Sequence, residues 1–195
     1  VADRVRDALR DALAQDEPDR RMLALANRVL GALQEGNPAQ ARLLTAVGPA
    51  LETSPAPPVV PLSHSALVTN DQGVNYHQIL RSELLSADRV DMVCPFIGNQ
   101  GVNLILDRLQ ELGPRLRVVT TTYLGGTNLQ ALERLARTGA RIKIVYERPE
   151  QKTALHAKAW IFHRDTGFTT AAIGSSNLSP RALVDGLEWN VRLSV

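Results

Sequence analysis

The C-terminal stretch of the sequence, residues 155–195, carries the pattern from which the rest of the chain can be interpreted: LHAKAWIFHRDTGFTTAAIGSSNLSPRALVDGLEWNVRLSV. His156 and Lys158 stand two residues apart in a run that predicts a strand, so both side chains leave the same face of the sheet. A second strand is expected to end at residues 174–177 (GSSN), where a glycine lets the backbone approach a ligand closely. Glu188 opens a third expected strand, from which its carboxylate can point back toward the histidine. The pattern therefore places an imidazole beside an ammonium group, with an amide and a carboxylate within reach.

This ordered set, H-x-K followed by G-S-x-N and then E, resembles the motif of the phospholipase D superfamily, the HKD phosphodiesterases. A lone H-x-K occurs by chance, whereas the ordered set on expected strands is much more specific. The resemblance is close over residues 155–195 and looser from residue 61 onward. The family pattern has an aspartate five positions after the lysine, where this chain has His163. We interpret Asp165, within D-T-G, as part of a hairpin turn.

The resemblance implies phosphodiester chemistry that needs neither a metal nor a cofactor. The implied catalytic residues are His156, Lys158, Asn177 and Glu188. A phosphodiester carries a negative charge that repels anionic nucleophiles, so a neutral imidazole suits the attack and forms a phosphohistidine. Lys158 and Asn177 would hold the non-bridging oxygens. Glu188 would accept a hydrogen bond from the far ring nitrogen of a histidine and so fix its tautomer.

Two further residues are candidates for substrate binding, Ser175 and Arg181. Arg181 follows the G-S-S-N-L-S-P run and can reach a substrate phosphate. It equally fits a role at the start of a helix that Ser179-Pro180 begins, where it would only cap or solvate the helix.

The number of motif copies bears on the assembly. Of the four histidines in the chain, His64, His77 and His163 lack a lysine two residues later, so the chain holds one half-site. Superfamily members with a single motif pair two chains, one histidine acting as nucleophile and its mate as general acid. The resemblance therefore implies a homodimer with an isologous interface.

Several phrases indicate which branch the chain resembles. Residues 120–128 (TTTYLGGTN) and the stretch 155–195 look like the PLD-like domain at the N-terminus of bacterial DEAD/DEAH-type superfamily II helicases. The resemblance implies a nuclease that acts on nucleic acid, in particular DNA, joined to a helicase motor in a longer protein. Two other functions stay open: a binding module that grips nucleic acid or a partner without turnover, and a phosphodiesterase for phospholipids or their headgroups.

Composition sets wider limits. The 195 residues are 44% hydrophobic and 22% charged, which is typical of a globular protein, and the net charge of +2 permits a polyanionic partner without requiring one. The single cysteine, Cys94, excludes an internal disulfide, and its apolar neighbours predict a buried thiol in a protein of the reducing cytosol. No run of 18 apolar residues and no signal peptide occur, so we expect a cytoplasmic protein without a membrane partner. Since the chain starts without methionine, we expect a domain excised from something longer.

Periodicity divides the chain into three parts. Residues 1–51 carry apolar stripes typical of amphipathic helices, residues 52–61 (ETSPAPPVVP) predict a stiff proline-rich linker, and residues 62–195 form the PLD-like domain. From Leu62 onward, apolar strand patterns alternate with helix patterns, one of which Gly113-Pro114 ends. This alternation predicts an α/β fold with a mixed, mainly parallel sheet flanked by helices, preceded by the small helical N-terminal segment.

Overall fold

The computed structural model describes residues 58–71, 73–147, 154–165 and 167–195. The helical segment expected over residues 1–51 and most of the expected linker lie outside these residues. The described elements, in chain order, are β1 (Ala66–Val68), α3 (Tyr76–Ser86), β2 (Arg89–Val93), α4 (Asn99–Leu112), η1 (Gly113–Arg115), β3 (Leu116–Thr121), η2 (Tyr123–Gly125), α5 (Leu129–Arg137), β4 (Arg141–Val145), β5 (Ala159–His163), β6 (Thr170–Gly174), α6 (Pro180–Val184) and β7 (Asn190–Ser194).

The strands form one sheet in the order β1-β7-β6-β5-β2-β3-β4. β2, β3 and β4 pair in parallel, whereas the pairs β1–β7, β7–β6, β6–β5 and β5–β2 are antiparallel. The expected α/β class and the mixed sheet are confirmed, but the expectation of a mainly parallel sheet is wrong. Among strands that are neighbours in the sheet, helical crossovers join only β2 to β3 and β3 to β4, since the strands that α3 joins, β1 and β2, are separated by β7, β6 and β5. The later strands follow one another through a turn and a loop with the short α6, and neighbouring strands joined in this way run antiparallel.

The helix ends follow local sequence signals. Asn75 and Gln78 form a reciprocal capping box at the start of α3, each side chain accepting the other residue's backbone N–H at 3.0 Å. At the C-terminal end of α4, the C-cap residue Gly113 has a φ of 54°, a left-handed conformation that glycine adopts without steric cost. The helix end predicted at Gly113-Pro114 is therefore confirmed.

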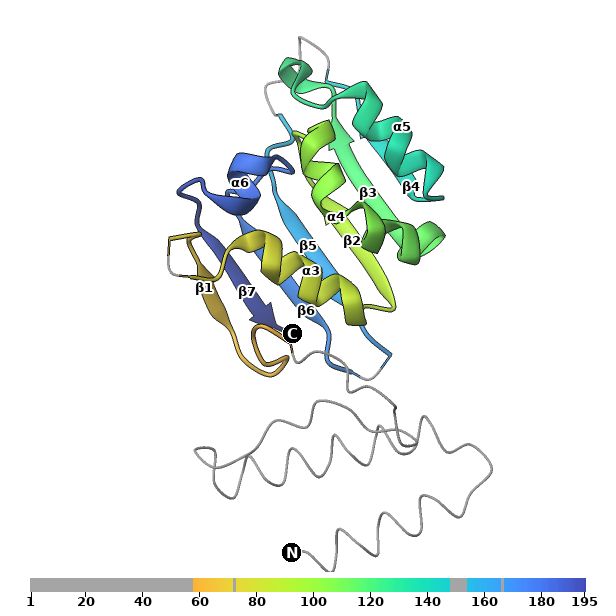
Figure 1. The fold of residues 1–195 in the computed structure, drawn as a ribbon. Helices are drawn as coiled ribbons and strands as arrows, with labels where there is room; N and C mark the ends of the chain where they lie inside the picture. Colours follow the sequence, from red (N-terminus) through yellow and green to blue (C-terminus); the bar gives the residue numbers. More distant parts are fainter. Residues whose placement is uncertain (1–57, 72, 148–153, 166) are drawn as a thin grey trace, which may run out of the picture. The chain divides into compact units, whose positions relative to one another are not determined.

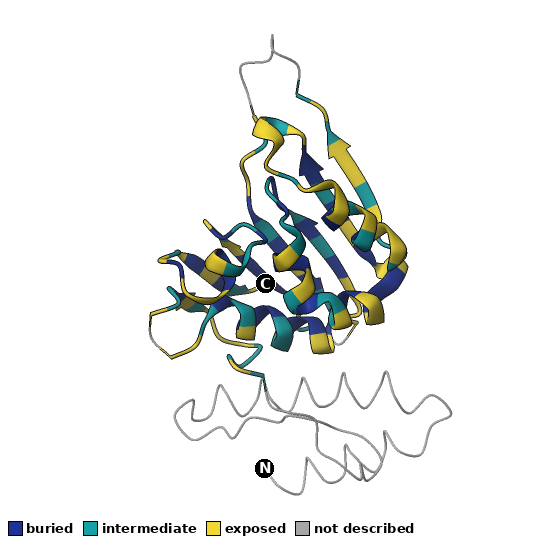
Figure 2. Cartoon of the chain, turned by 45° about the horizontal axis from the view of Figure 1, so that its top comes forward, coloured by how far each residue is buried: buried dark blue, intermediate teal, exposed yellow. Residues whose placement is uncertain are grey.

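The core lies between the helices and one face of the sheet (Figure 1, Figure 2). Alternate strand residues point into it, including Val90 and Met92, Leu116 and Val118, and Trp160 and Phe162. In the described part of the chain, α3, α4, α5 and α6 all lie on this face (Figure 1). The other face of the sheet carries exposed apolar side chains, namely Leu67, Ile161, Ile173 and Val191.

A charged cluster lies inside this core. Glu83 of α3 is 3% exposed, and its two carboxylate oxygens accept hydrogen bonds from Arg164 at 2.6 Å and from Arg192 at 2.8 Å. Thr170 donates to the same carboxylate at 2.6 Å. Arg192 and Asn190 stand two apart in β7, so they share one face of the strand, and both are buried on the side that the helices cover.

Among the described residues, no helix combines the length and the apolar character that a membrane span requires.

Candidate active site

The four predicted catalytic residues and Ser175 lie at one edge of the sheet because the late strands run antiparallel to their neighbours. β2, β3, β4 and β6 end at the edge where β5 and β7 begin. Residues that follow one group of strands therefore lie beside residues that precede the other. The edge is formed by Phe96 after β2, residues 121–123 at and after the end of β3, Glu147 after β4, residues 155–158 before β5, residues 174–177 at the end of β6 and residues 187–189 before β7.

His156 and Lys158 were expected within a strand, but β5 begins only at Ala159. The strand shortens because its neighbour β2 ends there: Val93 pairs with Ala159, and β2 offers no partner for earlier residues. On the other side, the pairing continues, since the Gly174 N–H donates to the Lys158 carbonyl at 3.2 Å. The H-x-K segment is thus extended and held along one side only.

The Lys158 ammonium is buried against the His156 residue. The Lys158 residue is only 8% exposed, and Nζ donates to the His156 carbonyl at 2.8 Å. Nζ also lies 3.3 Å from Nδ1 and 3.4 Å from Nε2 of the His156 ring, which is itself exposed. Among the described carboxylates, none forms an ion pair with this ammonium. A buried charge without a counter-charge is costly, so a bound anion at the open histidine side would be favoured.

Ser175 and Glu188 form a second contact pair at the same edge. The Ser175 hydroxyl donates to Oε2 of Glu188, and the Trp189 N–H donates to that hydroxyl oxygen at 3.0 Å. Among the described residues, the Glu188 carboxylate therefore hydrogen bonds to Ser175 of its own chain and not to His156. Like His156, Glu188 lies just before its strand rather than in it, since β7 begins at Asn190.

Asn177 lies in the loop after β6, half-buried, and its Oδ1 is buried without a hydrogen-bond partner among the described residues. The next residue fixes the loop: the Leu178 N–H donates to the Phe96 carbonyl at 3.2 Å, and the Gly98 N–H donates to the Leu178 carbonyl at 2.8 Å. These bonds hold Asn177 beside the start of α4. An orphaned buried acceptor can be satisfied by a donor that a ligand brings.

Gly174 was expected to let a ligand approach, but the structure gives it another role. A Cβ at this position would lie 2.3 Å from the Trp189 carbonyl oxygen and equally close to Oδ1 of Asn190. Because Gly174 has no side chain, its backbone can pack closely against Trp189 and Asn190 at the start of β7. Buried Asn190 then braces the loop, donating to the Ser176 hydroxyl at 2.8 Å and accepting the Ser176 N–H at 3.3 Å.

Phe96, which belongs to no sequence motif and was not predicted, has its ring next to that of His156. The Phe96 and His156 rings meet edge to face, with centroids 5.9 Å apart and planes at 75°. The Phe96 ring also stacks on that of Tyr123, with centroids 6.5 Å apart and planes at 14°. Only the position of Phe96 after a strand that ends at this edge could have indicated it.

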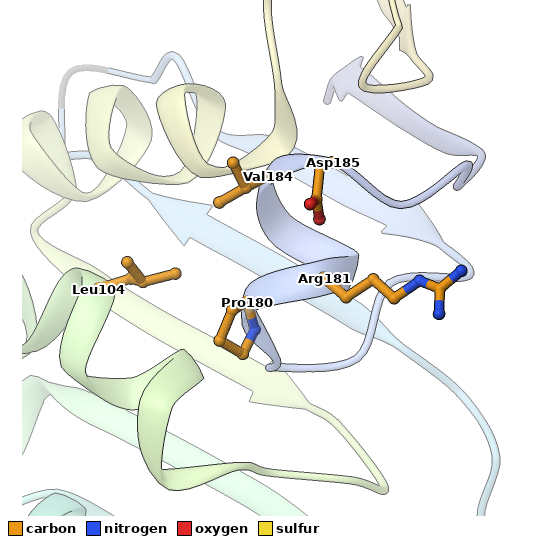
Figure 3. Close-up of a pocket in the computed structure, with 5 residues that line it drawn as sticks. All are labelled: Leu104, Pro180, Arg181, Val184 and Asp185. Carbon is orange, nitrogen blue, oxygen red and sulfur yellow. The ribbon is translucent and has the colours of Figure 1, made fainter.

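Arg181 lies on α6, away from these contacts. Its side chain lines an open hollow together with Leu104 and residues 180, 184 and 185, and in Figure 3 its guanidinium extends away from Leu104. Of the residues that the structure describes, none of the four predicted catalytic residues lines this hollow or bonds Arg181. The Ser179 side chain caps α6 by accepting the Ala182 N–H at 3.3 Å, so the helix predicted after Ser179-Pro180 is present.

The residue at the family's aspartate position lies far from this edge. His163 is the last residue of β5, at the end opposite the site, and its Nε2 lies 2.9 Å from Asp91. The ion pair with Arg117, assisted by His163, lowers the pKa of Asp91 to about 2. Asp165 follows at the turn, where the Gly167 N–H donates to the Arg164 carbonyl at 3.1 Å. The interpretation of Asp165 as a turn residue is confirmed.

The single cysteine is a buried neighbour of this edge. Cys94 is 2% exposed, and burial raises the pKa of its thiol. Within the described residues, no group of three or more histidine, cysteine or carboxylate side chains is placed to hold a metal ion.

Comparison with known proteins identifies the family. The family model described as "Cardiolipin synthase, PLD-like domain" matches residues 79–194. Nuc from Salmonella typhimurium, a phospholipase D family member of solved structure, is similar with a TM-score of 0.51 and 19% identity, over 67% of this chain and 82% of that chain.

Two other solved structures show weaker similarity. NucT from Helicobacter pylori has a TM-score of 0.48 and 12% identity, over 66% of this chain and 84% of that chain. Yeast tyrosyl-DNA phosphodiesterase has a TM-score of 0.46 and 13% identity, over 66% of this chain and 31% of that chain. No curated protein sequence matches the chain. Because the family model matches more than half of the chain, and the matched residues include the H-x-K, G-S-x-N and E residues of this chain, the chain belongs to the PLD-like domain family of the phospholipase D superfamily.

Proposed function

We propose that this chain is a metal-independent phosphodiesterase, a nuclease that acts on DNA through a phosphohistidine intermediate. The observation that carries the proposal is the buried ammonium of Lys158 against His156, with no described carboxylate to neutralise it. An anionic phosphodiester supplies the missing negative charge and brings phosphorus to an exposed imidazole. Charge-assisted hydrogen bonds to phosphate oxygens are among the stronger polar contacts in proteins.

The chemistry assigns one task to each group. A ring nitrogen of His156 attacks phosphorus, so that a P–N bond forms and the P–O bond to the leaving group breaks. The leaving oxygen takes a proton from a general acid, and water then cleaves the P–N bond. Lys158 donates a hydrogen bond to a non-bridging oxygen, whose negative charge grows in the transition state of the attack. The Asn177 amide group extends the donor set from the neighbouring loop, the Ser175 hydroxyl joins it when its hydrogen turns from Glu188 to the substrate, and Arg181 guides more distant phosphates.

A single copy of the chain lacks a second histidine to act as the general acid. The chain holds one H-x-K, and the other histidines of the described residues lie elsewhere, on the loop before β1 (His64), on α3 (His77) and at the far end of β5 (His163). We therefore propose that two copies complete one site, and that Glu188 orients the histidine that acts as the acid. A helicase motor in the same protein is proposed from the resemblance of residues 120–128 and 155–195 alone.

The test is a nuclease assay on single- and double-stranded DNA in the presence of EDTA. Wild-type protein should cut, and His156→Ala should lose activity by at least about a thousandfold while still binding DNA. His64→Ala is the matched control, because His64 is exposed and its side chain, among the described residues, hydrogen bonds only to Ser63. Equal activity in His156→Ala would contradict the assignment. Turnover of phosphatidyl substrates without any on DNA would favour the lipid class, and DNA binding without cutting would favour a binding module.

Mixed dimers test the composite site. If both histidines of a dimer are needed, random mixing of equal amounts of wild-type and His156→Ala chains should leave about one quarter of the activity of an all-wild-type sample, whereas independent sites would leave about one half. The mass of the assembly from light scattering should be that of a dimer. A monomer that cuts DNA at full rate would contradict the two-copy site.

A further inference from the structure

Glu147 joins three parts of the site edge through one carboxylate oxygen. Its Oε1 accepts the Leu155 N–H at 2.7 Å and the Thr121 hydroxyl at 2.9 Å. Leu155 immediately precedes His156, Thr121 ends β3, and Glu147 itself follows β4. The carboxylate thus fixes the backbone next to the nucleophile against the end of two parallel strands.

The contacts continue from Thr121 back to the histidine. The Thr121 hydroxyl accepts the Tyr123 N–H at 3.1 Å while it donates to Glu147, which restricts its rotation. Tyr123 stacks on Phe96, and the Phe96 ring meets the edge of the His156 ring. The series of contacts thus starts at the backbone of Leu155, just before His156, and ends at the His156 ring.

These contacts restrain the segment around His156, which lies beyond the last residue pair of β2 and β5. His156 is exposed and precedes β5, and β2 ends at the pairing of Val93 with Ala159. The sheet therefore restrains the H-x-K segment only from the β6 side, through the Lys158 carbonyl. A carboxylate is an acceptor with no donor of its own, so it can take both the N–H and the hydroxyl without competition. Hydrogen bonds to an ionised acceptor are roughly twice as strong as neutral ones.

We propose that Glu147 is a positioning residue for the nucleophile: it holds His156 in the orientation that attacks phosphorus, without touching the substrate. The kinetic part of this inference rests on the proposed phosphodiesterase function. A misplacement of a reacting group by about 1 Å can cost about 100-fold in rate. Loss of Glu147 should therefore lower kcat by roughly 10- to 100-fold and leave KM nearly unchanged, because the binding groups Lys158 and Asn177 stay in place.

The experiment compares four variants of the full chain on the chromogenic diester bis(p-nitrophenyl) phosphate. Glu147→Ala removes both hydrogen bonds, whereas Glu147→Gln keeps an acceptor oxygen of the same reach and should recover activity to within about threefold of wild type. Thr121→Val removes one bond with little change in shape and should lower kcat by a smaller factor. The matched control is Glu133→Ala, since Glu133 is an exposed carboxylate on α5. Urea denaturation of each variant establishes that it is folded.

A second readout does not depend on turnover. The imidazole signals of His156, assigned by their loss in His156→Ala, should be single and sharp in the wild-type NMR spectrum and broadened or split in Glu147→Ala. Unchanged kcat and unchanged imidazole signals in Glu147→Ala would overturn the inference, as would a Glu147→Gln variant as slow as Glu147→Ala. If Glu147→Ala does not fold, Thr121→Val decides by the same two readouts. Wild-type protein that hydrolyses no diester would overturn the proposed function, and the imidazole signals would still decide the positioning.

Discussion

Glu83 provides the sharpest test of how the domain is held together. Its carboxylate is 3% exposed and is the negative partner of two buried guanidinium groups, those of Arg164 (6% exposed) and Arg192 (0% exposed). Arg192 also donates through Nη1 to backbone carbonyl oxygens, including that of Pro61 at 2.9 Å. In Glu83→Ala both guanidinium groups would stay buried without a counter-charge.

The expected cost follows from this loss. Removing one partner of a buried ion pair typically costs about 3–5 kcal/mol, which is a large share of the roughly 5–15 kcal/mol that stabilises a native protein. For a chain of this size, each kcal/mol shifts Tm by about 2–4 °C, so Glu83→Ala should lower Tm by roughly 10 °C. Glu83→Gln keeps the volume but not the charge, and if charge is the cause it should lose most of the same free energy.

The assay is urea denaturation followed by tryptophan fluorescence, in which Trp160, 3% exposed, reports on the core. Glu111→Ala is the control, because Glu111 pairs with Arg108 at 3.0 Å but its side chain is 59% exposed, and a surface pair contributes about 1 kcal/mol or less. The reasoning would be refuted if Glu83→Ala cost no more than Glu111→Ala. A large loss in Glu83→Ala with little in Glu83→Gln would assign the effect to packing instead of charge.

Two further predictions concern the sheet and the site loop. Arg117 lowers the pKa of Asp91 to about 2, so the stabilisation that ionised Asp91 contributes is present above its ordinary pKa of about 3.9 and is lost as the pH falls through about 2. Asp91→Asn should therefore have a lower Tm than wild type at pH 7. A difference in Tm at pH 2 as large as that at pH 7 would contradict this. Gly101→Ala would place a Cβ 2.2 Å from the Leu178 carbonyl oxygen, so it should cost about 1–3 kcal/mol in the same urea assay and also lower activity. Gln100→Ala, at an exposed position of the same helix, should cost little, and equal losses in the two variants would rule out the steric cause.

Local sequence determined the elements and most of the candidate groups. Strand and helix patterns from residue 62 onward predicted the α/β alternation, and Gly113 correctly marked the end of α4, because these signals depend on side-chain periodicity and on backbone freedom at single positions. The spacing of His156 and Lys158 placed their side chains together, because residues two apart in an extended chain share a face. The roles of the predicted catalytic residues stay predictions until they are tested by mutation.

How these parts come together depends on contacts between segments that are distant in the sequence. Strand order determined that β5 pairs antiparallel with β2, and so brought residues before β5 beside residues after β2, β3 and β4. The neighbours Phe96 and Glu147 stand 60 and 9 positions before His156 in the sequence and carry no motif of their own. Arg192 of β7 is buried because Glu83 of α3, a helix far away in the sequence, supplies its counter-charge. Such contacts join segments far apart in the chain, and periodicity reports only on a residue's own element.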